Sequence, residues 1–323
     1  MNSVTESSGI SINKAIDNLM YDIFALGEIH VDFKIEIPRF PKPDDVLFIK
    51  HSEKRVSGKI AEFCFGVARQ DLRIACISSV GNDENGNFVR KSFAKEGIID
   101  FYLSELEERT TPVYIVIFTC DGQKTTLKSE HTHLLQLPKQ LVSLEVLKKA
   151  RHLHLTVNNL PTALKAAKIA KKLGLSVSLD LESEVVQENI KNLPQLLKYI
   201  DLLLTHKKAS NIFTKIERPR VAALKLLEYG PKVVIITHGV EGVILSTKNT
   251  QKTFPPFKVD NIADTTGARS AFNAGFISAY LRHYSLDDCI NQGQASAALK
   301  IQSVGDQQYF PLRNEVERFL IDH

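Results

Sequence analysis

The feature that most constrains the fold of this chain is a regular alternation of short apolar runs with longer amphipathic segments. A strand-like run is followed by a helix-like one from residue 21 to about residue 237. The strand-like runs are 21–29, 73–81, 152–157, 175–182, 201–206 and 232–237, and the helix-like ones are 62–70, 85–97, 162–174, 190–200 and 220–230. This alternation predicts a parallel sheet covered by helices on both faces. Ligands bind such sheets at the carboxyl ends of the strands.

Three segments follow a different pattern, in which apolar and polar residues alternate one by one. They are residues 33–40, 44–56 and 111–128, and the last contains the hairpin signal Asp121-Gly122. We expect them to form a small antiparallel sheet, a lid at about 33–55 and 110–128. Residues 1–20 are predicted to be an N-terminal extension, and 21–323 a single domain.

Composition excludes several classes of protein. The chain has 41 basic and 37 acidic residues spread along its length, which does not indicate a nucleic-acid partner. No apolar run approaches the length of about 18 residues that spans a membrane, and the first 20 residues carry acids rather than a signal peptide's apolar block. The four cysteines are far apart, which is typical of reduced thiols in a cytoplasmic protein.

The segment Asp264–Phe272, "DTTGARSAF", carries the most specific chemistry. We expect a strand at 257–262, a tight turn at Gly267 and a helix that starts next to Ala268. Backbone N–H groups at such a helix start converge on one point and can bind an anion. If that anion is a phosphoryl group in transfer, a nearby side chain must accept a proton, and the side chain at that place is Ser270.

Together with other ordered motifs, this segment resembles the ribokinase-type sugar kinases, the PfkB carbohydrate kinase family. The resemblance covers roughly residues 21–315 and implies a Rossmann-like ribokinase fold, a three-layer α/β/α core with a small antiparallel β-lid. Its motifs are "ALGEIHVDF" with Asp32, the segment 57–88 with Gly58 and Glu62, "VVIITHGVEGVIL" with Thr237, Gly239 and Gly242, "DTTGARSAFNAGF", and "QGQASAALKIQSVGDQ".

The resemblance implies ATP-dependent transfer of a phosphoryl group to a hydroxyl of a sugar or nucleoside, in a homodimer joined through the lid. It assigns the base position to Ser270 and the anion hole to Gly267, Ala268 and Arg269. The substrate-contacting positions that it implies are Asp32, Gly58 and Glu62, and the nucleotide-side positions are Thr237, Gly239, Gly242, Asp264 and His206.

The chain departs from the family pattern at its chemical positions. The family has Asp where this chain has Ser270, Gly where it has Arg269, and Asn where it has Glu62. The family's Asn-x-x-Glu pair, which organises Mg²⁺, is replaced by His206 and Ala209, so we expect no metal bound by the protein and doubt a role for Mg²⁺. General-base assistance contributes about 10²–10⁴ in rate.

We therefore expect kinase activity that is weak or lost. A replacement base could come from Asp264, from Glu62 or from water. The alternatives are a non-catalytic protein that binds a nucleotide or sugar, and a dimeric scaffold. Two His-x-His pairs, at His131 and His133 and at His152 and His154, are consistent with a metal site, but we expect ordinary core or rim histidines.

Overall fold

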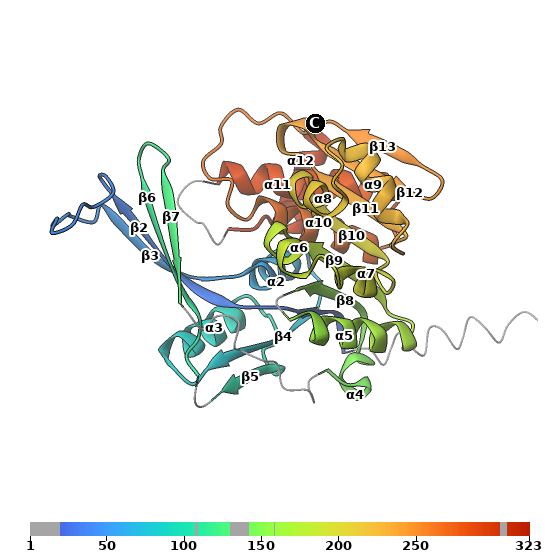
Figure 1. Ribbon diagram of the computed structural model, residues 1–323, viewed down its shortest axis with the longest axis horizontal. Helices are drawn as coiled ribbons and strands as arrows, with labels where there is room; N and C mark the ends of the chain where they lie inside the picture. Colours follow the sequence, from blue (N-terminus) through green and yellow to red (C-terminus); the bar gives the residue numbers. More distant parts are fainter. Residues whose placement is uncertain (1–19, 107–108, 130–141, 158, 304–308) are drawn as a thin grey trace, which may run out of the picture.

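A large twisted sheet with helices on both faces forms the body of the protein, and a smaller sheet projects from it (Figure 1). The computed structural model describes residues 20–106, 109–129, 142–157, 159–303 and 309–323. Residues 1–19 of the expected extension at 1–20, and the pair His131 and His133, lie outside these residues. Within them, no helix is long and apolar enough to cross a membrane.

The large sheet has the strand order β13-β12-β11-β10-β9-β8-β1-β4-β5. It is parallel from β5 to β11, and β12 and β13 extend it in antiparallel pairing. The strands are β1 Tyr21–Leu26, β4 Ile74–Gly81, β5 Leu103–Leu106, β8 Ala150–Thr156, β9 Ser176–Leu181, β10 Leu202–His206, β11 Val233–Thr237, β12 Val243–Thr247 and β13 Gln251–Phe254.

Both faces of this sheet are buried, which explains why its strands are apolar throughout. In β1, Phe24 and Leu26 belong to one hydrophobic core, whereas Ile23 and Ala25 belong to the other, as the alternation of side chains along a strand requires. The helices on the first face are α4 Leu144–Leu147, α5 Leu160–Lys172, α6 Ser183–Asn189, α7 Leu193–Leu197, α8 Lys207–Thr214 and α9 Pro219–Leu227. The other face carries α2 Lys59–Ala68, α3 Glu84–Lys95, α10 Ala268–Leu281 and α11 Leu286–Gln302, and α12 Arg313–Asp322 packs on α11. The predicted three-layer α/β/α core is confirmed.

The projecting sheet, which we call the lid, has the strand order β3-β2-β6-β7 (Figure 1). Its strands are β2 His30–Ile37, β3 His51–Ser57, β6 Val113–Thr119 and β7 Lys124–Lys128. The outer pairs are antiparallel as expected, but the central pair, β2 with β6, is parallel. The register places Asp32 opposite Arg55 on one side and Tyr114 on the other.

Three local expectations were wrong. Residues 44–50 form turns and irregular backbone rather than the first half of a strand, and 257–262 contains no strand. The expected helix at 190–200 is confined to α7, and α6 precedes it. Pro194 explains the late start of α7, because proline is tolerated in the first turn of a helix and disfavoured in its interior.

The histidine pair on β8 is part of the core, as expected, and is held by serines of β9. His152 Nδ1 and Nε2 lie 2.7 Å from the hydroxyls of Ser176 and Ser178, and His154 Nδ1 lies 2.7 Å from that of Ser178. The His154 ring also stacks on Phe63 at 3.7 Å between centroids. Burial, and then the proximity of His152, lowers the pKa of His154 well below its usual 6.5.

We expect His154→Phe to make the fold more tolerant of acid. Because the folded pKa of His154 is depressed, its stabilising contribution is present above pH 6.5 and is lost as the pH falls. Between pH 6.5 and 5 the wild type should lose about 2 kcal/mol more of its free energy of unfolding than the variant. At pH 7 the two should agree within about 1 kcal/mol, since one hydrogen bond is lost and the ring stack is kept. Urea denaturation at both pH values measures this, and identical pH dependences would contradict it.

Candidate active site

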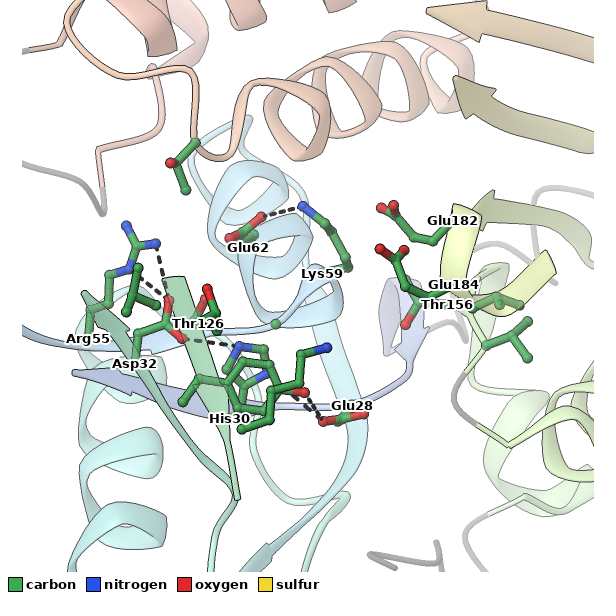
Figure 2. Close-up of a pocket in the computed structure, with 18 of the residues that line it drawn as sticks. Glu28, His30, Asp32, Arg55, Lys59, Glu62, Thr126, Thr156, Glu182 and Glu184 are labelled. Atoms are coloured by element: carbon green, nitrogen blue, oxygen red, sulfur yellow. Dashed lines mark hydrogen bonds and ion pairs between the residues drawn. The ribbon is translucent and has the colours of Figure 1, made fainter. Parts of the chain in front are cut away.

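A cleft of about 420 Å³ lies between the lid and the carboxyl ends of the central strands (Figure 2). Its walls come from segments far apart in the sequence and are rich in charged and hydroxyl side chains. The lining residues are Glu28, His30, Asp32, Arg55, Ser57, Gly58, Lys59, Glu62, Tyr114, Val116, Lys124, Thr126, Lys128, Thr156, Val157, Glu182, Glu184, Val185 and Thr266. Of the residues predicted from the sequence, the cleft brings together Asp32, Gly58 and Glu62.

Asp32 is a buried carboxylate on the lid side of the cleft, held by two basic side chains (Figure 2). Its Oδ2 accepts hydrogen bonds from Arg55 Nε at 3.3 Å and Nη2 at 3.2 Å, and its Oδ1 lies 3.2 Å from His30 Nε2. Burial raises the pKa of Asp32, but His30 and Arg55 outweigh it and lower the pKa overall. Asp32 is therefore ionised and held in place when a ligand arrives.

The turn from β3 into α2 brings the backbone close to the cleft. Gly58 has φ 101°, and a Cβ at this position would lie 2.6 Å from the carbonyl oxygen of Glu28, so only glycine fits. One turn later, Glu62 reaches from α2 to the start of α10. Its Oε2 accepts a 2.6 Å hydrogen bond from Ser270 Oγ and lies 3.5 Å from Lys59 Nζ. Ser270 is buried and does not line the cleft, whereas Glu62 does.

The start of α10 has the geometry of an anion site. Gly267 adopts φ 80° and caps the helix. Among the described residues, the backbone N–H groups of Gly267, Arg269 and Ser270 have no hydrogen-bond partner, as expected for a first helical turn. Asp264 lies before the turn, where it accepts a 2.8 Å bond from the Thr266 N–H and a 3.4 Å bond from Lys34 Nζ. Asp264 therefore stabilises the loop. It does not line the cleft, where a base would act.

The Arg269 side chain reaches from the first turn of α10 to the carboxylates at the end of β9. Its Nη2 pairs with Glu182 Oε1, and its Nε lies 3.9 Å from Asp180 Oδ1. Burial, and then the neighbouring Glu182, raises the pKa of Asp180 to about 7 despite the guanidinium. His206, at the end of β10, lies 3.2 Å from the Ser183 hydroxyl and 3.8 Å from Glu182 Oε2. Arg269 thus links the first turn of α10 to the carboxyl end of β9.

The residues at the family's Asn-x-x-Glu positions, His206 and Ala209, do not fit a Mg²⁺ site. Ala209 is fully buried and has no side-chain oxygen, and His206 faces Ser183 and Glu182. The carboxylates at the end of β9, Asp180 and Glu182, are paired with the Arg269 guanidinium. A hard divalent cation prefers several oxygen ligands, so we assign no step to a metal held by these residues.

Three of the predicted nucleotide-side residues lie at the end of β11 and in the turn that follows it. Thr237 ends β11 opposite His206, and Gly239 and Gly242 shape the turn into β12. Gly242 has φ 85°, and a Cβ there would lie 2.0 Å from the carbonyl oxygen of Phe254. The cleft is lined by none of the five predicted nucleotide-side residues, which are Thr237, Gly239, Gly242, His206 and Asp264.

Sequence reasoning missed several charged residues of the site: His30, Arg55, Lys59, Asp180, Glu182 and Glu184. Asp180 and Glu182 stand at the end of a predicted strand, where the carboxyl-end rule could have found them. Arg55 could be identified only from the pairing of β2 with β3, because its partner Asp32 lies 23 residues earlier in the chain.

Comparisons with known proteins identify the family of this chain. The family model described as "pfkB family carbohydrate kinase" matches residues 20–313. A ribokinase of Haemophilus influenzae is 30% identical over 302 residues, which cover 91% of this chain and 97% of the relative. A nucleoside kinase of Methanothermobacter thermautotrophicus is 26% identical over 308 residues, covering 92% and 95%.

The solved structures support the same fold. Arabidopsis thaliana ribokinase, solved in complex with ribose and ATP, superposes with a TM-score of 0.82 at 22% identity and covers 93% of this chain and 98% of its own. The family match spans nearly the whole described fold, including both walls of the cleft and the start of α10. The chain therefore belongs to the pfkB family of carbohydrate kinases.

Proposed function

We propose that this protein transfers a phosphoryl group from ATP to a hydroxyl of a sugar or nucleoside, and that it does so slowly. The observation that carries the proposal is the single cleft that joins the lid, with Asp32, to Thr266 at the turn into α10. A polyhydroxylated ligand in this cleft would meet carboxylates that accept its hydroxyl hydrogens. The N–H groups at the start of α10 that have no partner among the described residues would stabilise the charge on the transferred group.

The activities named for the relatives support both classes of acceptor, sugars and nucleosides. Proteins similar to this chain are named as ribokinases, nucleoside kinases and an ATP-dependent ribose-1-phosphate kinase, and one structural neighbour was solved with ribose and ATP. Slow turnover is expected because Ser270 replaces the family's Asp. A serine hydroxyl is a poor proton acceptor near neutral pH. The rate should therefore be about 10²–10⁴ lower unless another group accepts the proton.

A second candidate function is binding without turnover. It is favoured by the ion pair between Arg269 and Glu182, which brings a guanidinium from the first turn of α10 to a carboxylate that lines the cleft. The guanidinium could hold a nucleotide phosphate firmly and still leave no productive path to an acceptor.

The rate of ADP release separates the two functions. The acceptors are D-ribose, D-ribose 1-phosphate and adenosine, each at millimolar concentration with ATP, with and without Mg²⁺. Acceptor-dependent ADP release together with a phosphorylated product supports the kinase. Saturable binding of ATP or acceptor by calorimetry with no product supports the binding protein. If neither nucleotide nor acceptor binds, both proposals fail and a dimeric scaffold remains.

We also propose a homodimer formed through the lid, in a cytoplasmic protein. Large apolar side chains are exposed in the loop between β2 and β3, with Val46 92%, Phe48 90% and Ile49 56% exposed. Burial of such a patch against a second copy would remove apolar surface from water. The free thiols of all four cysteines are consistent with a reducing compartment. Sedimentation equilibrium tests the dimer, and a monomer at micromolar concentration would refute it.

A further inference from the structure

We propose that Glu62 is the proton acceptor for phosphoryl transfer in this chain and that Ser270 is the positioning residue that holds it. The inference rests on the proposed kinase function and assigns its missing base. The family's carboxylate on α10 is absent, but a carboxylate from α2 reaches the same place. The juxtaposition is direct, because Ser270 Oγ donates a 2.6 Å hydrogen bond to Glu62 Oε2.

The two oxygens of Glu62 have different surroundings. Oε2 accepts from the Ser270 hydroxyl and faces Lys59 Nζ at 3.5 Å. Oε1 has no hydrogen-bond partner among the residues that the structure describes. The Glu62 side chain is 13% exposed, and it lines the cleft together with Asp32 and Thr266. In Figure 2, Glu62 lies on the first turn of α2 and is joined to Lys59. Oε1 is therefore the atom available to an acceptor hydroxyl.

The charges around Glu62 favour its ionised form. Burial raises the pKa of its carboxyl, but the Lys59 ammonium and the Ser270 hydroxyl outweigh this effect and hold the pKa below the usual 4.5, with Arg55 and His30 of the lid acting in the same direction. Arg269 on α10 adds a further positive charge, and Asp180 on β9 is the acidic neighbour that opposes it. At neutral pH the carboxylate is ready to take a proton.

The reaction step follows from this placement. The acceptor hydroxyl oxygen forms a bond to the terminal phosphorus of the nucleoside triphosphate, and its proton moves to Glu62 Oε1. The bond from that phosphorus to the bridging oxygen breaks, and the electron pair leaves with the nucleoside diphosphate. Ser270 keeps its own proton and its hydrogen bond to Oε2, so it fixes the carboxylate without entering the reaction.

The test compares Glu62→Gln with wild type in steady-state kinetics, using ATP and whichever of D-ribose, D-ribose 1-phosphate or adenosine supports ADP release. Glutamine keeps an oxygen to accept from Ser270 but cannot take a proton at neutral pH. We expect kcat to fall by about 10²–10⁴ while the KM for ATP changes less than about threefold, because the nucleotide-side residues are untouched. Glu145→Gln, which removes an exposed carboxylate on α4, is the matched control and should behave as wild type.

Two further variants exclude a merely structural effect. In Ser270→Ala, the loss of the hydrogen bond should move the acidic limb of the kcat profile to higher pH; an unmoved limb would overturn the assigned role of Ser270. In Glu62→Gln/Ser270→Asp, the carboxylate returns to the family's position and should recover at least tenfold of the lost kcat.

The outcomes separate this inference from the function on which it rests. If wild type turns over and Glu62→Gln keeps kcat within about fivefold, Glu62 is not the base and the kinase function stands. A folded double variant that binds ATP and recovers nothing also overturns the inference. If wild type itself turns over none of the acceptors, the kinase function fails, and the assignment of Glu62 fails with it.

Discussion

Replacing Arg269 with alanine is expected to lower the free energy of unfolding by about 3–5 kcal/mol at pH 8, the cost of breaking one side of a buried ion pair. Asp180 is 2% exposed and Glu182 16%, and Arg269 Nη2 and Nε are the cationic groups that face them from α10. Removing a cation from a helix N-terminus is favourable by about 0.3–1 kcal/mol. This gain is too small to offset the two carboxylates left without their guanidinium.

The same variant should have a distinctive pH dependence. The folded pKa of Asp180 is already raised to about 7 from its usual 3.8, and it should rise further without Arg269. A group with a raised folded pKa adds stability that is present at low pH and is lost as the pH rises through that pKa. The difference between wild type and Arg269→Ala should therefore be smaller at pH 5.5 than at pH 8.

Denaturation with guanidinium chloride at pH 5.5 and pH 8 measures both the loss of stability and its pH dependence. Arg313→Ala is the matched control, because Arg313 pairs with Glu317 on the surface, where both side chains are about 40% exposed and such a pair contributes about 0.5 kcal/mol or less. A loss under about 1 kcal/mol for Arg269→Ala, or the same loss at both pH values, would contradict the ion-pair account.

Gly242→Ala is expected to destabilise the fold by roughly 2–6 kcal/mol, from backbone strain and overpacking together. Gly242 has φ 85°, and a Cβ would lie 2.0 Å from the Phe254 carbonyl oxygen and 3.2 Å from the Pro255 carbonyl carbon. These neighbours are backbone atoms and cannot move aside alone. The segment is also anchored to α11, since Gln294 donates a 2.9 Å hydrogen bond to the Pro255 carbonyl.

Gly239 provides the control for this prediction, because it lies in the same turn, has a positive φ of 53°, and has open space where its Cβ would be. Gly239→Ala should lose only about 1–2 kcal/mol from the left-handed backbone. Thermal unfolding of the two variants beside wild type decides the question. Equal losses in the two variants would show that the contact with Phe254 is not what requires glycine at 242.

The alternation of apolar and amphipathic segments was sufficient to predict the layers of the fold. Each strand of the parallel core reads as an apolar run because it is buried on both faces, as Phe24 and Ile23 show on β1. The lid was harder to predict. The alternation identified its strands, but the parallel pairing of β2 with β6 is a long-range contact that no local pattern determines. Residues 44–50 share the alternation and form no strand.

The candidate site shows a sharper limit of sequence reasoning. The motifs located Asp32, Gly58, Glu62 and Ser270, yet the changes at 62 and 270 look like separate losses in the sequence. In the fold they are partners, although 208 residues separate them. Arg269 and Glu182 are likewise 87 residues apart. Such contacts arise because the helix starts and strand ends of an α/β sheet meet at one edge.

Calorimetric titration of the purified chain with ATP and with ADP, with and without Mg²⁺, tests most directly the central claim that this cleft is a working nucleotide-dependent site. It requires no choice of sugar. We expect saturable binding with a dissociation constant between micromolar and low millimolar. The reason is that the start of α10, next to Thr266 of the cleft, has N–H groups without a partner in the described part of the chain. No detectable heat at millimolar nucleotide would contradict both the kinase and the nucleotide-binding alternative.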